Sequence, residues 1–247
     1  SACTLLVASV IAVTVPPFTL PLRCTVMSWL YGSLLGTNLT EANLAKMGAL
    51  FARLHTQALD FRPPAGFTER TMSSYLARGE PDMLFEKGLV GVGAPRSRDV
   101  LRRTRARVTA AFEALYNDTQ GLRVIHNDLW HDNIKVYRGR LQPFDFEDTI
   151  WGYPVQDIAM AWQDLMTDVP ADRYEPLIAA FRAGYECLAP WPETAPDQID
   201  HFRAGRMLWV ANFVAQHERE HLAAHLAWLT PQLAHFLSTG QVRKPAT

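Results

Sequence analysis

The chain has 247 residues, which is enough for one large domain or two small ones. Its composition is that of a folded protein with a sizeable core: 48% hydrophobic, 20% charged and 11% aromatic residues. With 24 basic and 25 acidic residues the formal net charge is −1, so no overall field draws the chain to nucleic acid or to an anionic membrane. We therefore expect neither of these as a partner.

The N-terminal apolar run, residues 5–15, is rich in Val, Ile and Thr, which predicts a buried strand. It is shorter than the roughly 20 residues that cross a bilayer. Residues 1–4 lack the basic charge of a secretory signal, so we expect no targeting segment. Ser1 stands where a starting Met is usual, which indicates a fragment or a processed form. The three scattered cysteines (Cys3, Cys24, Cys187) indicate no disulfide framework and fit the reducing cytoplasm.

The first half of the chain predicts one more strand and two helices. The second strand is expected at residues 24–30. Thr40 is a typical helix N-cap, and the apolar residues after it recur at a spacing that builds one helical stripe: Leu44, Met47, Phe51 and Leu54. Residues 60–96 hold many Pro and Gly and are expected to be mostly loop with short helical pieces. Asp99 is expected to cap a helix over residues 100–118.

The second half begins with short strands and continues as helices. Strands are expected at residues 122–125, 134–137 and 141–144, the last two joined by a turn at Arg138-Gly139-Arg140. After Pro154 the pattern predicts helices over residues 155–167, 172–187, 197–217 and 219–238. The predicted fold class is therefore α+β: a mostly helical body with a small β-hairpin insert, preceded by a short β remnant.

Three oxygen-bearing side chains lie in this insert. Asp128 and Asn133 are five residues apart in the loop between two strands, and Asp145 follows the next strand. Because strands joined by a tight turn run antiparallel, we expect Asn133 and Asp145 to meet at one end, with Asp128 facing them. Such hard oxygen ligands suit Mg²⁺, and a carboxylate that is not on the metal can accept a hydroxyl proton. In kinase-type phosphoryl transfer one Asp orients and deprotonates the acceptor hydroxyl, while an Asn and a second Asp hold the metal ions.

The stretch from His126 to Asn133, with Phe144-Asp145-Phe146-Glu147 after it, resembles the motifs of the aminoglycoside phosphotransferase and choline kinase-like family. That family's loop reads His-Gly-Asp-x-x-x-x-Asn and is followed by Asp-Phe-Asp or Asp-Phe-Glu. Thr25 to Gly32 is similar to the family's last N-lobe strand and hinge. Leu50 to His55 is similar to a helix end of the family, and Gly152 to Met160 is similar to a helix start. The resemblance implies a protein kinase-like fold.

The resemblance also implies roles for individual residues. Asp128 is the expected catalytic base, and His126 braces the catalytic loop. Asn133 and Asp145 are the expected Mg²⁺ ligands. Asp157 is expected to partner the backbone of the loop.

The same resemblance divides the chain into an N-lobe remnant with the hinge at residues 1–32, and a helical C-lobe at residues 33–247. Adenine of the cofactor ATP is expected to meet backbone groups of Ser28, Trp29 and Leu30. No glycine precedes Gly32, so the family's Gly-rich loop is not expected here. Its phosphate-gripping lysine is not expected either, because the chain has only these lysines: Lys46, Lys87, Lys135 and Lys244.

Other residues of the insert have more ordinary explanations. Asn127 stands where the family usually has Gly, a mild change because Asn tolerates unusual φ better than most residues. Lys135 alternates with apolar strand residues and is expected to point away from the core. Glu147 and Asp148 either end the strand or contact the acceptor, and the former is favoured. Three tryptophans are expected in the core rather than in an aromatic wall for an amine: Trp151, Trp162 and Trp209.

The sequence leaves three functions open. The favoured one is the transfer of the γ-phosphoryl group of ATP to a hydroxyl of a small molecule, such as an amino alcohol, a sugar, an aminoglycoside or a homoserine-like compound. The second is a catalytically impaired kinase-like binding module or truncated remnant. The third is a metal-dependent hydrolase that uses His126, Asp128 and His131. Nothing in the sequence indicates the oligomeric state.

Overall fold

The computed structural model describes residues 9–13, 22–26, 29–65, 70–76, 79–88, 95–118 and 120–244. The α-helices in these ranges are α1 (Glu41–Gln57), α2 (Pro95–Tyr116), α3 (Pro154–Asp168), α4 (Ala171–Glu186), α5 (Gln198–His217) and α6 (Leu222–Thr239). The strands are β1 (Ser9–Val13), β2 (Leu22–Val26), β3 (Ser33–Leu34), β4 (Arg123–Ile125), β5 (Ile134–Tyr137), β6 (Arg140–Pro143) and β7 (Ile150–Gly152). The chain is helix-rich with small sheets, as the α+β prediction required.

The strands pair antiparallel in three small sheets, ordered β1-β2, β3-β5-β6 and β4-β7. The predicted hairpin is present: β5 and β6 pair with Ile134 opposite Pro143, and the turn lies at residues 138–139. Two strands were not predicted, β3 and β7. Each has two or three residues, which is too short to show the alternation by which a strand is recognised.

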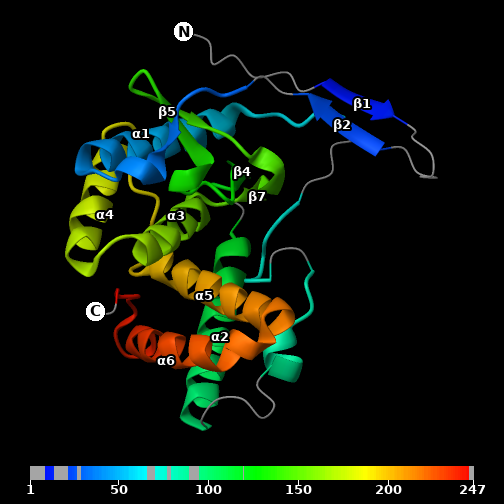
Figure 1. Cartoon of the computed structure of the whole chain (residues 1–247), viewed down its shortest axis with the longest axis vertical. Coiled ribbons are helices and arrows are strands. Elements are labelled where there is room, and N and C mark those ends of the chain that lie inside the picture. Colours follow the sequence, from blue (N-terminus) through cyan, green and yellow to red (C-terminus); the bar gives the residue numbers. More distant parts are fainter. Residues whose placement is uncertain are drawn as a thin grey trace.

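The helices form two packed groups around one core. In Figure 1, α1 lies beside α4 at the level of the small sheets, and α2, α5 and α6 lie together below them. Helix α3 connects the groups because it packs against both α5 and α4. The predicted stripe of α1 faces this core, where Leu44, Met47 and Phe51 are buried. Thr40 caps α1 as predicted, since its Oγ1 accepts a hydrogen bond from the Asn43 amide.

The start of α2 differs from the prediction. Asp99 was expected to cap this helix, but α2 begins at Pro95 and Asp99 lies inside its first turns. Pro is favoured in the first turn because its missing N–H would have no helical partner there. Asp99 instead forms an exposed ion pair with Arg103 one turn later, at 3.7 Å. A potential N-cap residue was therefore mistaken for the helix start.

In the part of the chain that the structure describes, no helix combines the length and the apolar character needed to cross a bilayer.

Glycine sets the distance between α1 and α4. A Cβ atom added at Gly184 would lie 1.9 Å from the carbonyl oxygen of Ala45, and one added at Gly48 would lie 1.9 Å from that of Phe181. Both obstacles are backbone atoms, which cannot move without separating the helices. The contact between α1 and α4 therefore requires glycine at both positions.

We predict that Gly184→Ala lowers the free energy of unfolding by about 2 kcal/mol, because overpacking outweighs the better helix propensity of Ala. Urea denaturation measures this change. Ala183→Ser, at the exposed neighbouring position, is the control and should change stability little. Equal stability of Gly184→Ala and the unsubstituted chain would contradict the close approach of the two helices.

Candidate active site

The loop after β4 is held by a single buried carboxylate. Asp157, in the first turns of α3, is 1% exposed. Its Oδ2 accepts a hydrogen bond from the His126 amide at 3.1 Å, and its Oδ1 accepts one from the Asn127 amide at 2.5 Å. Asn127 has φ of 65°, the left-handed conformation that Asn tolerates. The predicted contact between Asp157 and the loop backbone is confirmed.

Asp157 is itself oriented by a residue whose role the sequence did not reveal. His55, at the end of α1, is 2% exposed, and its Nε2 lies 3.1 Å from Asp157 Oδ2. Its Nδ1 lies 3.0 Å from the hydroxyl of Tyr185. Burial raises the pKa of Tyr185 to about 12, so the hydroxyl keeps its proton. The Asp157 carboxylate can only accept, so His55 Nε2 donates to it, and Nδ1 of the neutral ring then accepts the hydrogen bond from Tyr185. The available signals were a lone His at the end of an apolar helical stripe and the resemblance of Leu50 to His55 to a helix end of the family, neither of which gave His55 a role.

His126 braces the loop through its imidazole ring. Its Nε2 donates to the Phe144 carbonyl at 2.9 Å, and its Nδ1 accepts a long hydrogen bond of 3.4 Å from the Asp128 amide. A ring that donates with one nitrogen and accepts with the other is neutral. Both nitrogens are used, so His126 links the loop after β4 to the strand end before Asp145 and has no nitrogen left for a metal.

The hairpin brings Asn133 and Asp145 together, as the antiparallel argument predicted. The Phe144 amide donates to the Asn133 carbonyl at 3.0 Å, which places Asp145 one residue beyond this cross-strand pair. Asp145 has φ of 65°, an unusual conformation for a residue that is not glycine. Its side chain is exposed at the mouth of the hairpin.

Asp128 lies against Asn133. The amide Nδ2 of Asn133 donates to the Asp128 carbonyl at 2.7 Å and to the carboxylate Oδ2 at 3.0 Å. Burial raises the pKa of Asp128, Arg206 has the largest opposing effect, and the nearby Asp145 carboxylate raises it further. Asp128 therefore interacts with both of the other predicted site residues, Asn133 and Asp145.

These residues are suited to hold Mg²⁺ only together with a bound phosphate. Because Asn133 donates through Nδ2, its Oδ1 is the amide atom left to act as a ligand, and Asp145 adds a carboxylate. Within the described ranges no three His, Cys, Asp or Glu side chains form a group that could hold a metal ion by themselves. Mg²⁺ typically takes one or two protein carboxylates and completes its shell with phosphates and water.

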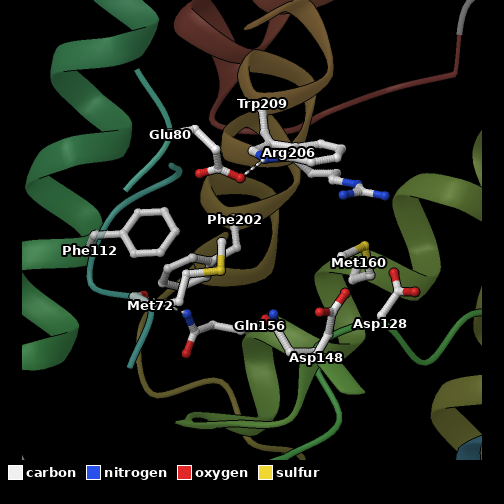
Figure 2. Close-up of a pocket in the computed structure, with 11 residues that line it drawn as sticks. Met72, Glu80, Phe112, Asp128, Asp148, Gln156, Met160, Phe202, Arg206 and Trp209 are labelled. Carbon is white, nitrogen blue, oxygen red and sulfur yellow. Dashed lines mark hydrogen bonds between the residues drawn. The ribbon is translucent and has the colours of Figure 1, made fainter. Parts of the chain in front are cut away.

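A cavity of about 330 Å³ opens beside Asp128. Figure 2 shows the carboxylates of Asp128 and Asp148 on one side, with the rings of Phe112 and Phe202 on the other. The other described residues of the lining come from loops and from α3 and α5: Met72, Glu80, Asn127, Gln156, Met160, Arg206 and Trp209. The cavity is therefore acidic and partly aromatic.

The sequence did not predict most of this lining. Asp148 was favoured as a strand end but lines the cavity. Of the three tryptophans considered for an aromatic wall, only Trp209 lines it, whereas Trp162 stacks on Trp191 in the core. Trp209 donates through Nε1 to Glu80 at 3.2 Å. The cavity residues come from separate helices and loops. Phe202, Arg206 and Trp209 share one face of α5 by their spacing, but no local pattern relates α5 to the other segments.

Arg206 and Asp164 form a second charged group next to Asp128. Arg206 Nη2 lies 3.8 Å from Asp164 Oδ2, and its guanidinium stacks over the Trp209 ring at 4.3 Å. Burial raises the pKa of Asp164 to about 6; Arg206 opposes this rise, while Asp128 and Asp168 add to it. Arg206 is thus flanked by the carboxylates of Asp128 and Asp164, which it interacts with electrostatically.

The segment that the sequence predicts as the hinge lies at the edge of the described residues. Ser28, the first residue expected to meet adenine, lies outside them. Trp29 is 74% exposed, and the Leu30 carbonyl accepts a hydrogen bond from Lys135 Nζ at 2.8 Å. Lys135 was expected to point away from the core, and its ammonium lies 4.7 Å from the ring of the exposed Trp29, so it connects β5 to the segment of Trp29 and Leu30.

The metal-hydrolase hypothesis has little geometric support. His126 uses both ring nitrogens within the loop, and His131 Nε2 is 2.8 Å from Asp168 Oδ2. His131 is therefore directed to an acidic partner on α3.

Solved structures of small-molecule kinases share this fold. A microcompartment-associated aminopropanol kinase matches with a TM-score of 0.75 at 19% identity, over 98% of this chain and 79% of its own. An amicoumacin kinase, hAmiN, in complex with AMP-PNP, Ca²⁺ and Ami, has a TM-score of 0.70 at 15% identity, over 90% and 68%. A choline/ethanolamine kinase family protein from Mesorhizobium loti has a TM-score of 0.56 at 19% identity, over 94% of this chain and 74% of its own. The chain therefore has the protein kinase-like fold, as predicted.

Residues 2–191 match the model of the phosphotransferase enzyme family. The match covers most of the chain, so the chain belongs to this family, and the resemblance seen in the sequence is confirmed. No curated protein matches the sequence significantly.

We predict that the ionisation of Asp164 lowers the free energy of unfolding as the pH rises. Between its unfolded pKa of 3.8 and its folded pKa of about 6 the native chain holds the extra proton, so the free energy of unfolding falls as the pH rises through this window. Asp164→Asn should remove this fall, which amounts to at most about 3 kcal/mol.

Urea unfolding between about pH 4 and pH 7 measures the effect. Asp172→Asn, at an exposed position in the first turn of α4, is the control and should keep the pH dependence of the unsubstituted chain. The same pH dependence in Asp164→Asn would contradict the raised pKa.

Proposed function

We propose that the chain transfers the γ-phosphoryl group of Mg²⁺-bound ATP to a hydroxyl of a small, amine-bearing molecule. The observation that carries the proposal is the meeting of Asp128, Asn133 and Asp145 at one end of the β5-β6 hairpin, beside a cavity. Membership of the phosphotransferase enzyme family supports it.

In this proposal Asn133 and Asp145 hold the metal. Mg²⁺ would neutralise the charge of the ATP phosphates as the bond to the β-phosphate breaks. The structure of the hairpin supports this assignment, because His126 and the Asn133–Phe144 pair fix both ligands to one rigid element. Rigid support matters since the ligand geometry of Mg²⁺ is narrow.

Asp128 is the proposed catalytic base. The Asn133 amide holds its carboxylate, which leaves the remaining oxygen to accept the proton of the acceptor hydroxyl. The deprotonated oxygen then attacks the γ-phosphorus, and ADP leaves with the electrons of the broken bond. His126 acts in catalysis by positioning Asp128, whose amide it holds.

The acceptor is proposed to carry an amine because of the cavity. Asp148 and Glu80 supply negative charge, and Phe112 and Phe202 supply aromatic faces that attract cations. Two structural relatives are named after amino alcohols: one is an aminopropanol kinase, and the other is a choline/ethanolamine kinase family protein. Among the acceptors that the sequence left open, an amino alcohol or another hydroxylated amine agrees best with this lining.

The adenine of ATP is proposed to lie against Ser28, Trp29 and Leu30. Lys135 supports this placement, because it joins the hinge to β5 two residues after Asn133, and two residues of a strand span about 7 Å. A nucleotide whose phosphates meet the metal at Asn133 would then extend its base toward the hinge.

We predict that Asp128→Asn lowers kcat by about 1,000-fold, because general-base catalysis is lost while the shape of the loop is kept. Transfer of ³²P from labelled ATP to a panel of hydroxylated amines and sugars measures this. Affinity for ATP should stay close to that of the unsubstituted chain. Full activity in Asp128→Asn would exclude the proposed base.

We predict that Asp145→Asn weakens binding of ATP in the presence of Mg²⁺ but not in its absence, because only the metal-bridged complex loses a ligand. Titration calorimetry with and without Mg²⁺ separates the two cases. Asp172→Asn is the matched control for removal of one negative charge.

Equal Mg²⁺ dependence in Asp145→Asn and the unsubstituted chain would contradict the metal site. Mg²⁺-dependent binding without any transfer in the unsubstituted chain would instead favour the non-catalytic binding module.

A further inference from the structure

Arg206 is the basic side chain among the described residues that line the cavity. It extends from α5, and Figure 2 shows its guanidinium on the same side of the cavity as Asp128, next to Met160. Asp128 and Arg206 line the same cavity, so the guanidinium lies on the side where the acceptor hydroxyl would react.

The donors of Arg206 are not consumed by the fold. Its Nε is buried and has no hydrogen-bond partner among the described residues. Its Nη2 lies 3.8 Å from Asp164 Oδ2, which is too long for a good hydrogen bond. Stacking over Trp209 holds the plane of the guanidinium, so the remaining N–H groups have a fixed direction.

The proposed reaction creates negative charge in this place. The acceptor oxygen bonds to the γ-phosphorus, its proton passes to Asp128, and the bond to the β-phosphate breaks to release ADP. The transferred phosphoryl group thereby becomes a phosphate ester of the acceptor. This ester lies in a cavity with three carboxylates, those of Glu80, Asp128 and Asp148. Without a cation the ester would be strongly destabilised there.

Two of the lysines are engaged elsewhere. Lys135 Nζ donates to the Leu30 carbonyl at the hinge. Lys244 Nζ donates to the Met166 carbonyl at the far end of α3.

We infer that Arg206 is a further catalytic residue, which donates hydrogen bonds to the transferring phosphoryl group and to the phosphate ester product. The inference rests on the proposed function and adds a contact from the acceptor side of the cavity. Arginine suits this task because its planar donors match phosphate oxygens and its charge is permanent.

Binding of a product and of its parent alcohol tests the inference without turnover. O-phosphoethanolamine and ethanolamine are titrated into the unsubstituted chain, Arg206→Met and Arg206→Lys, each with Mg²⁺ and ADP. The unsubstituted chain should bind the ester more tightly than the alcohol. Arg206→Met should lose ester affinity by at least about tenfold and keep its affinity for ethanolamine, with Arg206→Lys between them.

Arg103→Met is the matched control, because Arg103 is an exposed residue of α2 that forms a surface ion pair with Asp99 at 3.7 Å. It should bind both probes as the unsubstituted chain does. Equal ester affinity in Arg206→Met, or no ester binding by the unsubstituted chain, would overturn the inference. A loss of ethanolamine affinity alone would also overturn it, since Arg206 would then hold the acceptor and not the phosphate.

Kinetics of phosphoryl transfer to ethanolamine give an independent readout. Arg206→Met should lower kcat by about 100-fold with little change in KM, as expected for a donor that acts on the transition state. Unchanged kcat in Arg206→Met, beside loss of transfer in Asp128→Asn, would overturn the role of Arg206 and leave the proposed function intact. Transfer by Asp128→Asn at the full rate would instead count against the proposed function.

Discussion

The geometry of the candidate active site depends on one buried carboxylate, that of Asp157. It accepts hydrogen bonds from two consecutive loop amides, those of His126 and Asn127, and it is held from behind by His55. Hydrogen bonds to a charged group contribute about 1.5–3 kcal/mol each. This interaction fixes the left-handed turn at Asn127, and the turn determines where the Asp128 carboxylate points.

From that turn the site extends in two directions. On one side the β5-β6 hairpin carries Asn133 and Asp145, which are proposed to meet the metal-bound nucleotide. On the other side lies the cavity, where Asp148 follows Asp145 by three residues and faces the proposed acceptor. Asp128 lies between the two, in contact with Asn133 and with the cavity. One short stretch of chain therefore supplies residues to both halves of the proposed reaction.

The sequence predicted the parts of the site that local chemistry determines. The hairpin follows from alternation and a turn, so the meeting of Asn133 and Asp145 could be derived from strand direction alone. The tolerance of Asn127 for positive φ could be stated from its residue type, and the structure confirms it. The helices after Pro154 were visible in the apolar periodicity.

Other features depend on contacts between distant residues. His55 and Asp157 are 102 positions apart, and neither residue by itself indicates the pair. The cavity joins residues of α2, α3 and α5, so its acidic and aromatic character arises only when the helices pack. Strand β7 exists because β4 pairs with it, since its three residues have too little pattern of their own. Local propensity was also misleading at Asp99, which was a plausible cap inside a helix that starts earlier.

The most direct test of the central claim is a crystal structure of the chain with Mg²⁺ and a non-hydrolysable ATP analogue. The account predicts a metal bound by Asn133 Oδ1 and the Asp145 carboxylate at about 2.0–2.1 Å, with the phosphates completing its shell. Asp128 should remain off the metal and face the γ-phosphate across the cavity mouth. A metal and phosphates held by other residues, with Asp128 and Asp145 in separate sites, would contradict it.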